Sequence, residues 1–194
     1  WLLWDDVRWR PDTTDEVMRL AKDTVRSIYT EASEVEDEER RKAVGKWATR
    51  SESGSRIRAM NSLAKSEVPI TPDALDADPW LLNLENGTLN LRTGKLKEHD
   101  RKDLLTKLAP VVSDPEAECP TWIRFLDRVM DGDQTLIDFI QKAIGYALAG
   151  DTGEEVLFIL YGTGQNGKST FIETIEALLG DYALQTPTDT LMAR

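Results

Sequence analysis

The chain has 194 residues, of which 40% are hydrophobic and 30% charged, and its formal net charge at pH 7 is −11. These proportions are typical of a soluble globular protein with one large domain or two small ones. No apolar run approaches the roughly 20 residues that cross a bilayer, and no signal peptide is visible. The single Cys119 excludes internal disulfides and cysteine-based zinc sites. We therefore expect a cytoplasmic protein without a membrane partner.

The N-terminal residues predict a hairpin followed by a long helix. Residues 1–9 form two short apolar stretches around a two-residue aspartate turn, and Pro11 should end the second strand. Apolar residues then recur every three or four positions from 15 to 32, which predicts an amphipathic helix. Thr13 or Thr14 is expected to cap it.

The next segment is strongly basic. Residues 40–65 contain eight Lys or Arg and one acidic residue, Glu52, which gives the segment a charge of +7. Two helices separated by a Ser-Gly-Ser turn are expected, with Ser55 as the cap of the second. Basic helices that carry Trp47 suit contact with a nucleic-acid backbone. The alternative is that the segment neutralises the acidic residues 34–39 on one solvated surface.

A β meander is predicted from residue 80 to residue 96. Residues 80–84 and 88–91 alternate apolar and polar around an Asn86-Gly87 turn, and a second turn leads to a third strand. Alternate residues of a strand face the same side, so the leucines of this segment should form one buried face. These are Leu82, Leu84, Leu89, Leu91 and Leu96.

Two more helices are expected before residue 150. Thr121 should cap the first, which reaches Met130, and a break at residues 131–133 separates it from a second helix that ends at Gly150. The two helices lead directly into the most specific part of the sequence.

Four features resemble catalytic or metal-binding groups, but a structural role is the simpler interpretation of each. Two are carboxylate pairs of the kind that hold metal ions in polymerases, although turns and helix caps use the same residues. They are Asp76 with Asp78 and Asp131 with Asp133. His99 stands in a polar segment, as a surface histidine would, and Cys119 has no His or Cys partner at metal-ligand spacing.

A glycine-rich loop lies between an apolar run and a helical pattern. Residues 156–161 are six consecutive apolar residues, as in a strand buried on both faces of a parallel sheet. Residues 162–170 read Gly-Thr-Gly-Gln-Asn-Gly-Lys-Ser-Thr. Apolar residues at helical spacing continue to Leu179, and Gly180 stands where the helix should end. Strand, loop and helix in this order predict a phosphate-binding loop of the Walker A type.

The residue types in this loop suit phosphate chemistry. Gly162, Gly164 and Gly167 allow backbone N–H groups to converge on phosphate oxygens, and the helix N-terminus adds partial positive charge. Lys168 can reach the β- and γ-phosphates of ATP, and Ser169 can place its hydroxyl on Mg²⁺. The alternative is a glycine-rich turn that only caps the helix.

The loop resembles that of the phage and plasmid primase-helicases, a branch of the superfamily 3 helicases. Three segments upstream of it, residues 80–91, 105–110 and 139–151, resemble the same family. The first two are similar to the segment ahead of the motor that is related to the poxvirus-type primase-helicase. The resemblance therefore covers essentially the whole chain, and the upstream segments make it more specific than the loop alone.

The resemblance implies a fragment of an ATP-dependent DNA helicase that unwinds DNA as a ring, usually a hexamer. Residues 1–150 would be its α+β accessory domain, built from helices and small antiparallel hairpins. Residues 151–194 would be the first strand–P-loop–helix unit of an α/β ATPase of the AAA+ type. The intact parent would hydrolyse ATP, with ATP and Mg²⁺ bound between subunits.

The resemblance also implies that nine loop residues bind the nucleotide. They are Gly162, Thr163, Gly164, Gln165, Asn166, Gly167, Lys168, Ser169 and Thr170. Lys168 would be the catalytic residue, Ser169 the Mg²⁺ ligand and Thr170 a neighbour of the α-phosphate. The family's water-polarising carboxylate lies downstream of the loop and is not among these residues, so we expect no ATP hydrolysis by this chain alone. No residue pattern indicates primase activity.

Two other functions fit parts of the sequence. A small-molecule kinase could use the same loop, although such kinases usually carry it near their N-terminus. Alternatively, residues 1–150 could be a non-catalytic module for DNA docking or oligomerisation, in which the basic segment 40–65 makes the contact.

Overall fold

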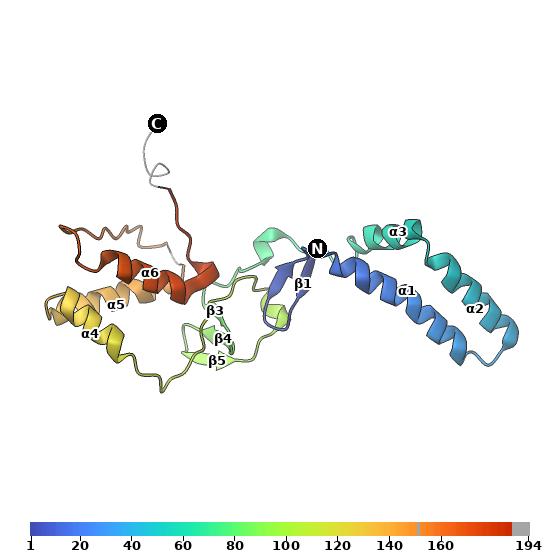
Figure 1. The fold of residues 1–194 in the computed structure, drawn as a ribbon, viewed down its shortest axis with the longest axis horizontal. Coiled ribbons are helices and arrows are strands. Elements are labelled where there is room, and N and C mark those ends of the chain that lie inside the picture. Colours follow the sequence, from blue (N-terminus) through green and yellow to red (C-terminus); the bar gives the residue numbers. More distant parts are fainter. Residues whose placement is uncertain (151, 188–194) are drawn as a thin grey trace. The chain divides into compact units, whose positions relative to one another are not determined.

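The computed structural model describes residues 1–150 and 152–187 (Figure 1). The chain divides into two compact units, which comprise residues 1–4 with 10–74 and residues 5–9 with the described part of 75–194. Residues 151 and 188–194, which belong to the predicted ATPase unit, lie outside this description, and the predicted boundary at residue 150 stays a prediction. Within the described residues, no helix combines the length and apolar character that a membrane span requires.

The N-terminal hairpin has a longer turn than the predicted one. Strands β1 (Leu2–Trp4) and β2 (Trp9–Pro11) form a two-stranded sheet, so the proline lies within the second strand. In the loop between them, the Asp5 carboxylate accepts hydrogen bonds from the backbone N–H groups of Val7 (3.1 Å) and Arg8 (2.8 Å). An aspartate that binds its own loop in this way stabilises a four-residue connection instead of a two-residue turn.

Three helices form the first unit, as predicted. Helix α1 (Glu16–Glu34) packs against α2 (Glu38–Ser51) and α3 (Gly54–Ala64). Because α3 begins at Gly54, Ser55 lies inside the helix and does not cap it. The apolar core between the helices is small. Its buried and partly buried members are Met18, Ala21, Val25, Ile57 and Met60.

An aspartate outside α1 satisfies the N-terminus of that helix. The Asp12 carboxylate accepts hydrogen bonds from the backbone N–H groups of Val17 and Glu16, both at 2.9 Å. These bonds favour the ionised carboxylate and lower the pKa of Asp12. Asp12, not Thr13 or Thr14, therefore provides the side-chain cap of α1.

A three-stranded antiparallel sheet lies in the second unit, with its strands paired in sequence order. The strands are β3 (Leu81–Leu84), β4 (Gly87–Asn90) and β5 (Lys95–Lys97). Leu84 pairs with Gly87, so the turn residues are Glu85 and Asn86, one position earlier than predicted. A Cβ on Gly87 would lie 2.4 Å from the carbonyl oxygen of Lys97, and the sheet therefore requires glycine there.

One face of this sheet carries the core of the second unit. Four of the five predicted leucines contribute to it, packed around Ala109. They are Leu82, Leu84, Leu89 and Leu91. Leu96 does not: it lies on the edge strand β5 and is 40% exposed. The alternation of the sequence thus predicted the buried face correctly except at the edge of the sheet.

Helices α4 (Pro120–Val129), α5 (Gln134–Leu148) and α6 (Lys168–Leu179) complete the regular structure. Short 3₁₀ helices occur at η1 (Pro72–Ala74), η2 (Arg101–Asp103) and η3 (Gly180–Tyr182). Since Pro120 is the first residue of α4, Cys119 precedes the helix, and Thr121 is not its cap. At α5 the Asp133 carboxylate accepts a hydrogen bond from the N–H of Leu136 (3.0 Å).

The strand predicted at residues 156–161 is absent from the described chain. These apolar residues are 43–90% exposed, and no described segment pairs with them in a sheet. An extended segment becomes a strand only when a neighbouring strand satisfies its backbone N–H and C=O groups. The α+β character of the chain is confirmed, whereas the strand of the predicted α/β unit does not form among these residues.

Candidate functional site

The loop after residues 156–161 has a backbone that suits its glycines. Gly164 and Gly167 have φ angles of 101° and 82°, and Gln165 between them has a φ of 48°. Glycine tolerates these angles better than other residues because it has no Cβ. At Gly162 a Cβ would lie 1.8 Å from the side-chain nitrogen of Asn166. The glycines therefore allow the chain to turn and leave space for Asn166.

Helix α4 fixes the position of the first turn of α6. A Cβ on Gly167 would lie 2.7 Å from Cγ1 of Val129, so the loop passes close to α4. Phe171, one turn later, is 7% exposed, and its ring centroid lies 5.7 Å from that of Trp122. Trp122 also stacks on Phe125 at 5.3 Å. This apolar contact holds the N-terminus of α6, where helical N–H groups lack partners within the helix, beside the loop.

Lys168 extends over its own loop. Its Nζ donates hydrogen bonds to Oδ1 of Asn166 (2.6 Å) and to the carbonyl oxygen of Gly162 (3.3 Å). In the part of the chain that the structure describes, no carboxylate forms an ion pair with this ammonium. Because both acceptors are neutral, an anion would form stronger, charge-assisted bonds with Nζ. Ser169 and Thr170 are exposed in the same turn of α6.

Gly162 and Asn166, which accept hydrogen bonds from the Lys168 amine, thus lie next to the first turn of α6. All nine predicted binding residues lie in this loop and the adjoining helical turn. Their individual roles, phosphate binding by Lys168 and Mg²⁺ binding by Ser169 among them, stay predictions.

The opposite end of α6 is fixed to the segment that follows the sheet. Gly180 has a φ of 52°, and a Cβ there would lie 2.4 Å from Cδ of Pro110. The backbone N–H of Asp181 donates to the carbonyl oxygen of Leu108 (3.2 Å), and its carboxylate accepts from the Leu108 N–H (3.1 Å). The same carboxylate forms an ion pair with Arg8. The predicted helix end at Gly180 is confirmed, and it is also a packing contact.

Tyr182 completes this contact. Its hydroxyl accepts a hydrogen bond from the backbone N–H of Asn83 (3.0 Å), and its ring packs against the leucine core. The ammonium of Lys107 lies 5.7 Å from the ring centroid. Burial raises the pKa of the Tyr182 phenol, because its ionised form would lose hydration. No motif in the sequence marks Asp181 or Tyr182, since both act through partners more than 70 residues away.

Asn83 is a buried polar residue on the other face of the sheet. It is 0% exposed, and its Nδ2 donates to the carbonyl oxygens of Val7 (3.1 Å) and Lys107 (3.0 Å). Its Oδ1 lies 3.0 Å from Nδ1 of His99 and accepts from the Thr88 hydroxyl (3.4 Å). His99, predicted to be an ordinary surface residue, is therefore half-buried and hydrogen-bonded. Strand alternation alone would leave this face to solvent.

In the described chain, three of the four paired carboxylates accept hydrogen bonds, and two of them, Asp78 and Asp133, have the predicted turn and cap roles. Asp76 accepts hydrogen bonds from the N–H (2.7 Å) and the hydroxyl of Thr106. Asp78 accepts from the N–H of Trp80 (3.0 Å), and Asp133 caps α5. Across residues 1–150 and 152–187, no three His, Cys, Asp or Glu side chains form a group that could hold a metal ion.

Residues 1–131 match the family model described as "D5 N terminal like", and the chain belongs to this family. The predicted resemblance to the primase-helicases is thereby confirmed. The loop at residues 162–170 lies beyond the matched region.

A viral protein gives the second comparison. The chain is similar to "Putative helicase L207/L206" of Acanthamoeba polyphaga mimivirus, with 29% identity over 110 residues. The match covers 55% of this chain and 12% of the viral protein. The chain therefore spans only a small part of the length of this relative.

Proposed function

We propose that residues 162–170 are a Walker A loop that binds ATP with Mg²⁺, in a chain that is part of an ATP-dependent DNA helicase of the primase-helicase family. The observation that carries this proposal is the Lys168 ammonium, which two neutral oxygens hold at the N-terminus of α6. A cationic side chain and a helix N-terminus attract anionic oxygens to the same point. A triphosphate supplies them.

The roles of the residues follow from the chemistry of the nucleotide. Gly162, Gly164 and Gly167 allow phosphate oxygens to approach the backbone, and Lys168 binds the β- and γ-phosphates. Ser169 supplies an oxygen ligand to Mg²⁺, and Thr170 lies near the α-phosphate. In the intact parent, which would assemble as a hexameric ring on DNA, a carboxylate downstream of this loop would polarise the attacking water. We expect the 194-residue chain to bind ATP.

The comparisons support a helicase over a small-molecule kinase. The loop is compatible with both, but the family match covers residues 1–131 and the viral relative is named a helicase. A kinase would leave this long N-terminal region unexplained.

Nucleotide titration of the 194-residue chain tests the loop. Lys168→Ala should weaken the binding of a fluorescent ATP analogue with Mg²⁺ by roughly ten-fold or more, because charge-assisted hydrogen bonds are lost. Lys142→Ala is the matched control, since it removes an exposed lysine from α5. The affinity for ADP should fall in Lys168→Ala as the affinity for ATP does. AMP, which has no β-phosphate, should bind weakly to the wild type and to Lys168→Ala alike. Equal ATP affinity in the wild type and Lys168→Ala would contradict the proposal.

The helicase assignment needs the intact parent. There Lys168→Ala should abolish ATP hydrolysis and duplex unwinding while the protein still unfolds cooperatively. Unwinding assays on a forked DNA substrate measure the effect. Retained turnover in this variant would show that another site hydrolyses the nucleotide.

A further inference from the structure

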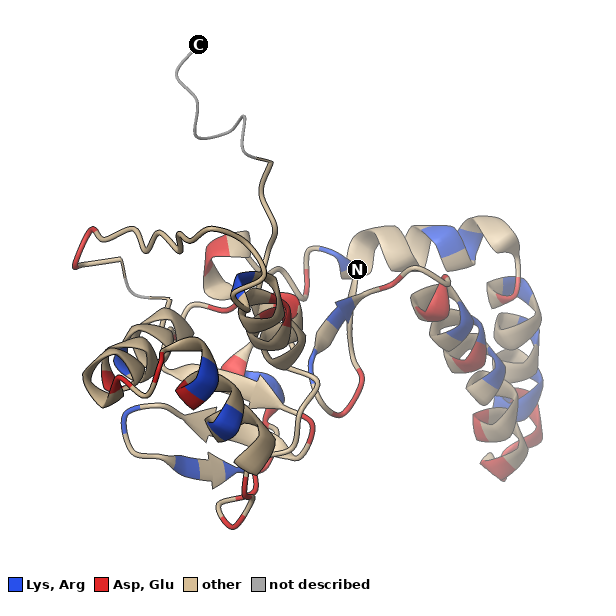
Figure 2. Ribbon diagram, turned by 60° about the vertical axis from the view of Figure 1, so that its left-hand side comes forward, with Lys and Arg blue, Asp and Glu red and all other residues tan. Residues whose placement is uncertain are grey.

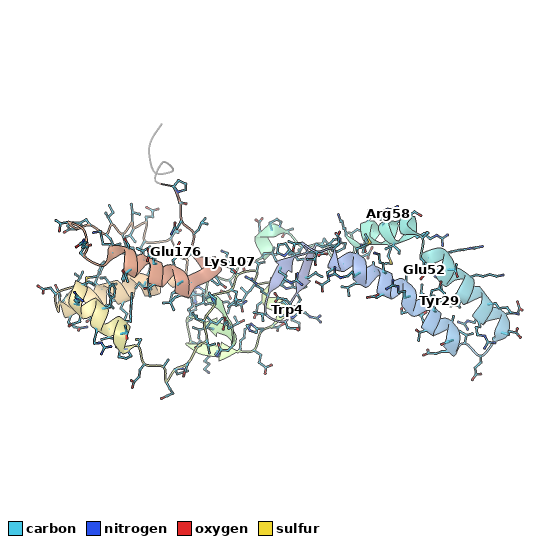
Figure 3. The ribbon with its side chains drawn as sticks, in the orientation of Figure 1. Trp4, Tyr29, Glu52, Arg58, Lys107 and Glu176 are labelled. Carbon is cyan, nitrogen blue, oxygen red and sulfur yellow. The ribbon has the colours of Figure 1, made fainter. Side chains whose placement is uncertain are left out.

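The outward side of α2 carries cations without carboxylate partners. In residues 40–65 only Lys42 forms ion pairs among the described residues, with Glu38 and Glu39 at 2.8 and 3.7 Å. Lys46 and Arg50 are exposed and have no such pair in the described chain. Glu52, the acidic residue of the segment, accepts a hydrogen bond from the hydroxyl of Tyr29 (3.1 Å; Figure 3). Apart from Lys42, the basic residues of this segment therefore form no ion pair with a carboxylate among the described residues.

These cations form a row along the helix. Lys42, Lys46 and Arg50 are four residues apart, and such spacing places them on one side of an α-helix over a length of about 12 Å. The side that packs inward carries Ala48 and Ser51, which are 0% and 7% exposed. Figure 2 shows the basic residues recurring along the helices of the first unit. We call Lys42, Lys46 and Arg50 the basic row.

An exposed aromatic ring adjoins the basic row. Trp47 follows Lys46 and is 56% exposed, and the Arg56 guanidinium of α3 lies 5.4 Å from its ring centroid. The ring borders a groove of about 680 Å³ between α1, α2 and α3, with Met60 and Leu63 among its lining residues. Leu63 is itself 71% exposed. A flat aromatic ring can stack on a nucleic-acid base, and cations beside it can bind the neighbouring phosphates.

We propose that the basic row, Trp47 and Arg56 form a contact surface for single-stranded DNA. The phosphates contact the Lys46 ammonium and the Arg50 guanidinium, the two members of the row that form no ion pair in the described chain, and one base stacks on Trp47 at the mouth of the groove. Single strands expose the faces of their bases, whereas duplex DNA keeps them stacked. This inference rests on the proposed function only in the choice of DNA as the partner, because it requires no nucleotide in the loop.

The charge favours nucleic acid over protein as the occupant. Residues 40–65 carry +7 in a chain whose net charge is −11. Helix α2 also carries Glu38 and Glu39, which pair with Lys42, so the cations left for an anionic partner are Lys46 and Arg50. The buried centre of a protein interface is poor in charged residues, and lysine is among the residues depleted there. Phosphate backbones, in contrast, bind lysine and arginine through the release of counterions.

Fluorescence anisotropy of a labelled oligo(dT) with the 194-residue chain tests the proposal at several KCl concentrations. The double variant Lys46→Gln/Arg50→Gln should reduce the slope of log K against log[KCl] by about 1.4, since each single-strand phosphate contact contributes about 0.7. Trp47→Ala should weaken binding roughly ten-fold, and Trp47→Phe should recover part of the loss. The control Lys95→Gln/Lys142→Gln removes the same charge from exposed positions of the second unit and should leave the slope unchanged.

Several outcomes would overturn the proposal. An unchanged slope in the basic-row variant, or an equal loss in the control, would show that DNA binds elsewhere or only through overall charge. If the variants alter self-association by sedimentation while DNA affinity stays constant, the surface is a protein interface. Circular dichroism and thermal unfolding establish that each variant folds. Lys168→Ala should keep its DNA affinity, and the basic-row variant its ATP affinity, so the two proposals can fail separately.

Discussion

Replacing Asn83 should destabilise the second unit far more than its place on a short strand suggests. Asn83→Ala removes two N–H donors and leaves the carbonyl oxygens of Val7 and Lys107 without these partners. Both bonds are part-buried. A buried oxygen that loses its donor costs about 1–3 kcal/mol, so the upper limit for the two is about 6 kcal/mol, and we expect a loss of about 2–4 kcal/mol in the free energy of unfolding. Because domains are stable by only about 5–15 kcal/mol, such a loss can unfold this unit.

Asn86→Ala provides a matched control, since Asn86 also forms two hydrogen bonds with backbone groups. Its side chain accepts from the Ser113 N–H and donates to the Ser113 carbonyl oxygen, both at 2.9 Å, but it is exposed. Water can replace these bonds, so this variant should lose no more than about 1 kcal/mol. Native-state hydrogen exchange at the amides of β3 and β4 measures both losses. Similar losses in the two variants would refute the reasoning from burial.

Asn83→Asp separates the hydrogen bonds from the volume of the side chain. The carboxylate has nearly the shape of the amide but would face two carbonyl oxygens, so burial and repulsion should raise its pKa. A raised pKa in the folded state means that stability is present below the ordinary aspartate value and is lost as the pH rises. The deficit relative to the wild type should therefore be larger at pH 7 than at pH 4. A deficit that does not change with pH would show that the site tolerates the charge.

Two further predictions concern the end of α6. Gly180→Ala should lower the free energy of unfolding by about 1–3 kcal/mol, because the new Cβ would lie 2.4 Å from Cδ of Pro110. Urea denaturation measures this loss. Gly150→Ala is the control, since Gly150 also has a positive φ but a Cβ there would meet no atom within 4 Å. The raised pKa of Tyr182 predicts a stabilisation that is present below pH 10 and lost as the pH rises through the folded-state value. Tyr182→Phe should remove this part of the pH dependence between pH 8 and pH 11, and an unchanged profile would exclude Tyr182 as its source.

Patterns within a few residues predicted the local structure well. The three- and four-residue spacing gave the helices α1, α4, α5 and α6, and strand alternation gave the core leucines of the sheet. The errors at helix caps have a simple cause, because several polar residues stand near each start. Asp12 reaches the first turn of α1 from outside it, and no spacing rule favours this carboxylate over the neighbouring threonines.

Features that depend on distant segments were not predictable in the same way. Asn83 follows the pattern of a polar, solvent-facing strand residue, yet residues 5–8 and 99–107 provide its partners. The apolar run at residues 156–161 was predicted to be a buried strand, but these residues are exposed and pair with no described segment. A strand needs a neighbouring strand, and the apolar pattern alone does not show whether one is present. The Walker A pattern can be recognised from the sequence, because its glycine, lysine and serine positions lie within eight residues, and phosphate binding by the loop stays a prediction.

Both ends of helix α6 contact other elements of the second unit. Its first turn packs against α4 beside the exposed loop. The residues that directly follow its last turn, Gly180, Asp181 and Tyr182, contact Leu108, Pro110 and Asn83 through hydrogen bonds and close packing. A helix of 12 residues is a stiff rod about 18 Å long. We therefore expect a displacement of the loop end along the helix axis to change the hydrogen bonds of Asn83 and Leu108 in the segment at its other end.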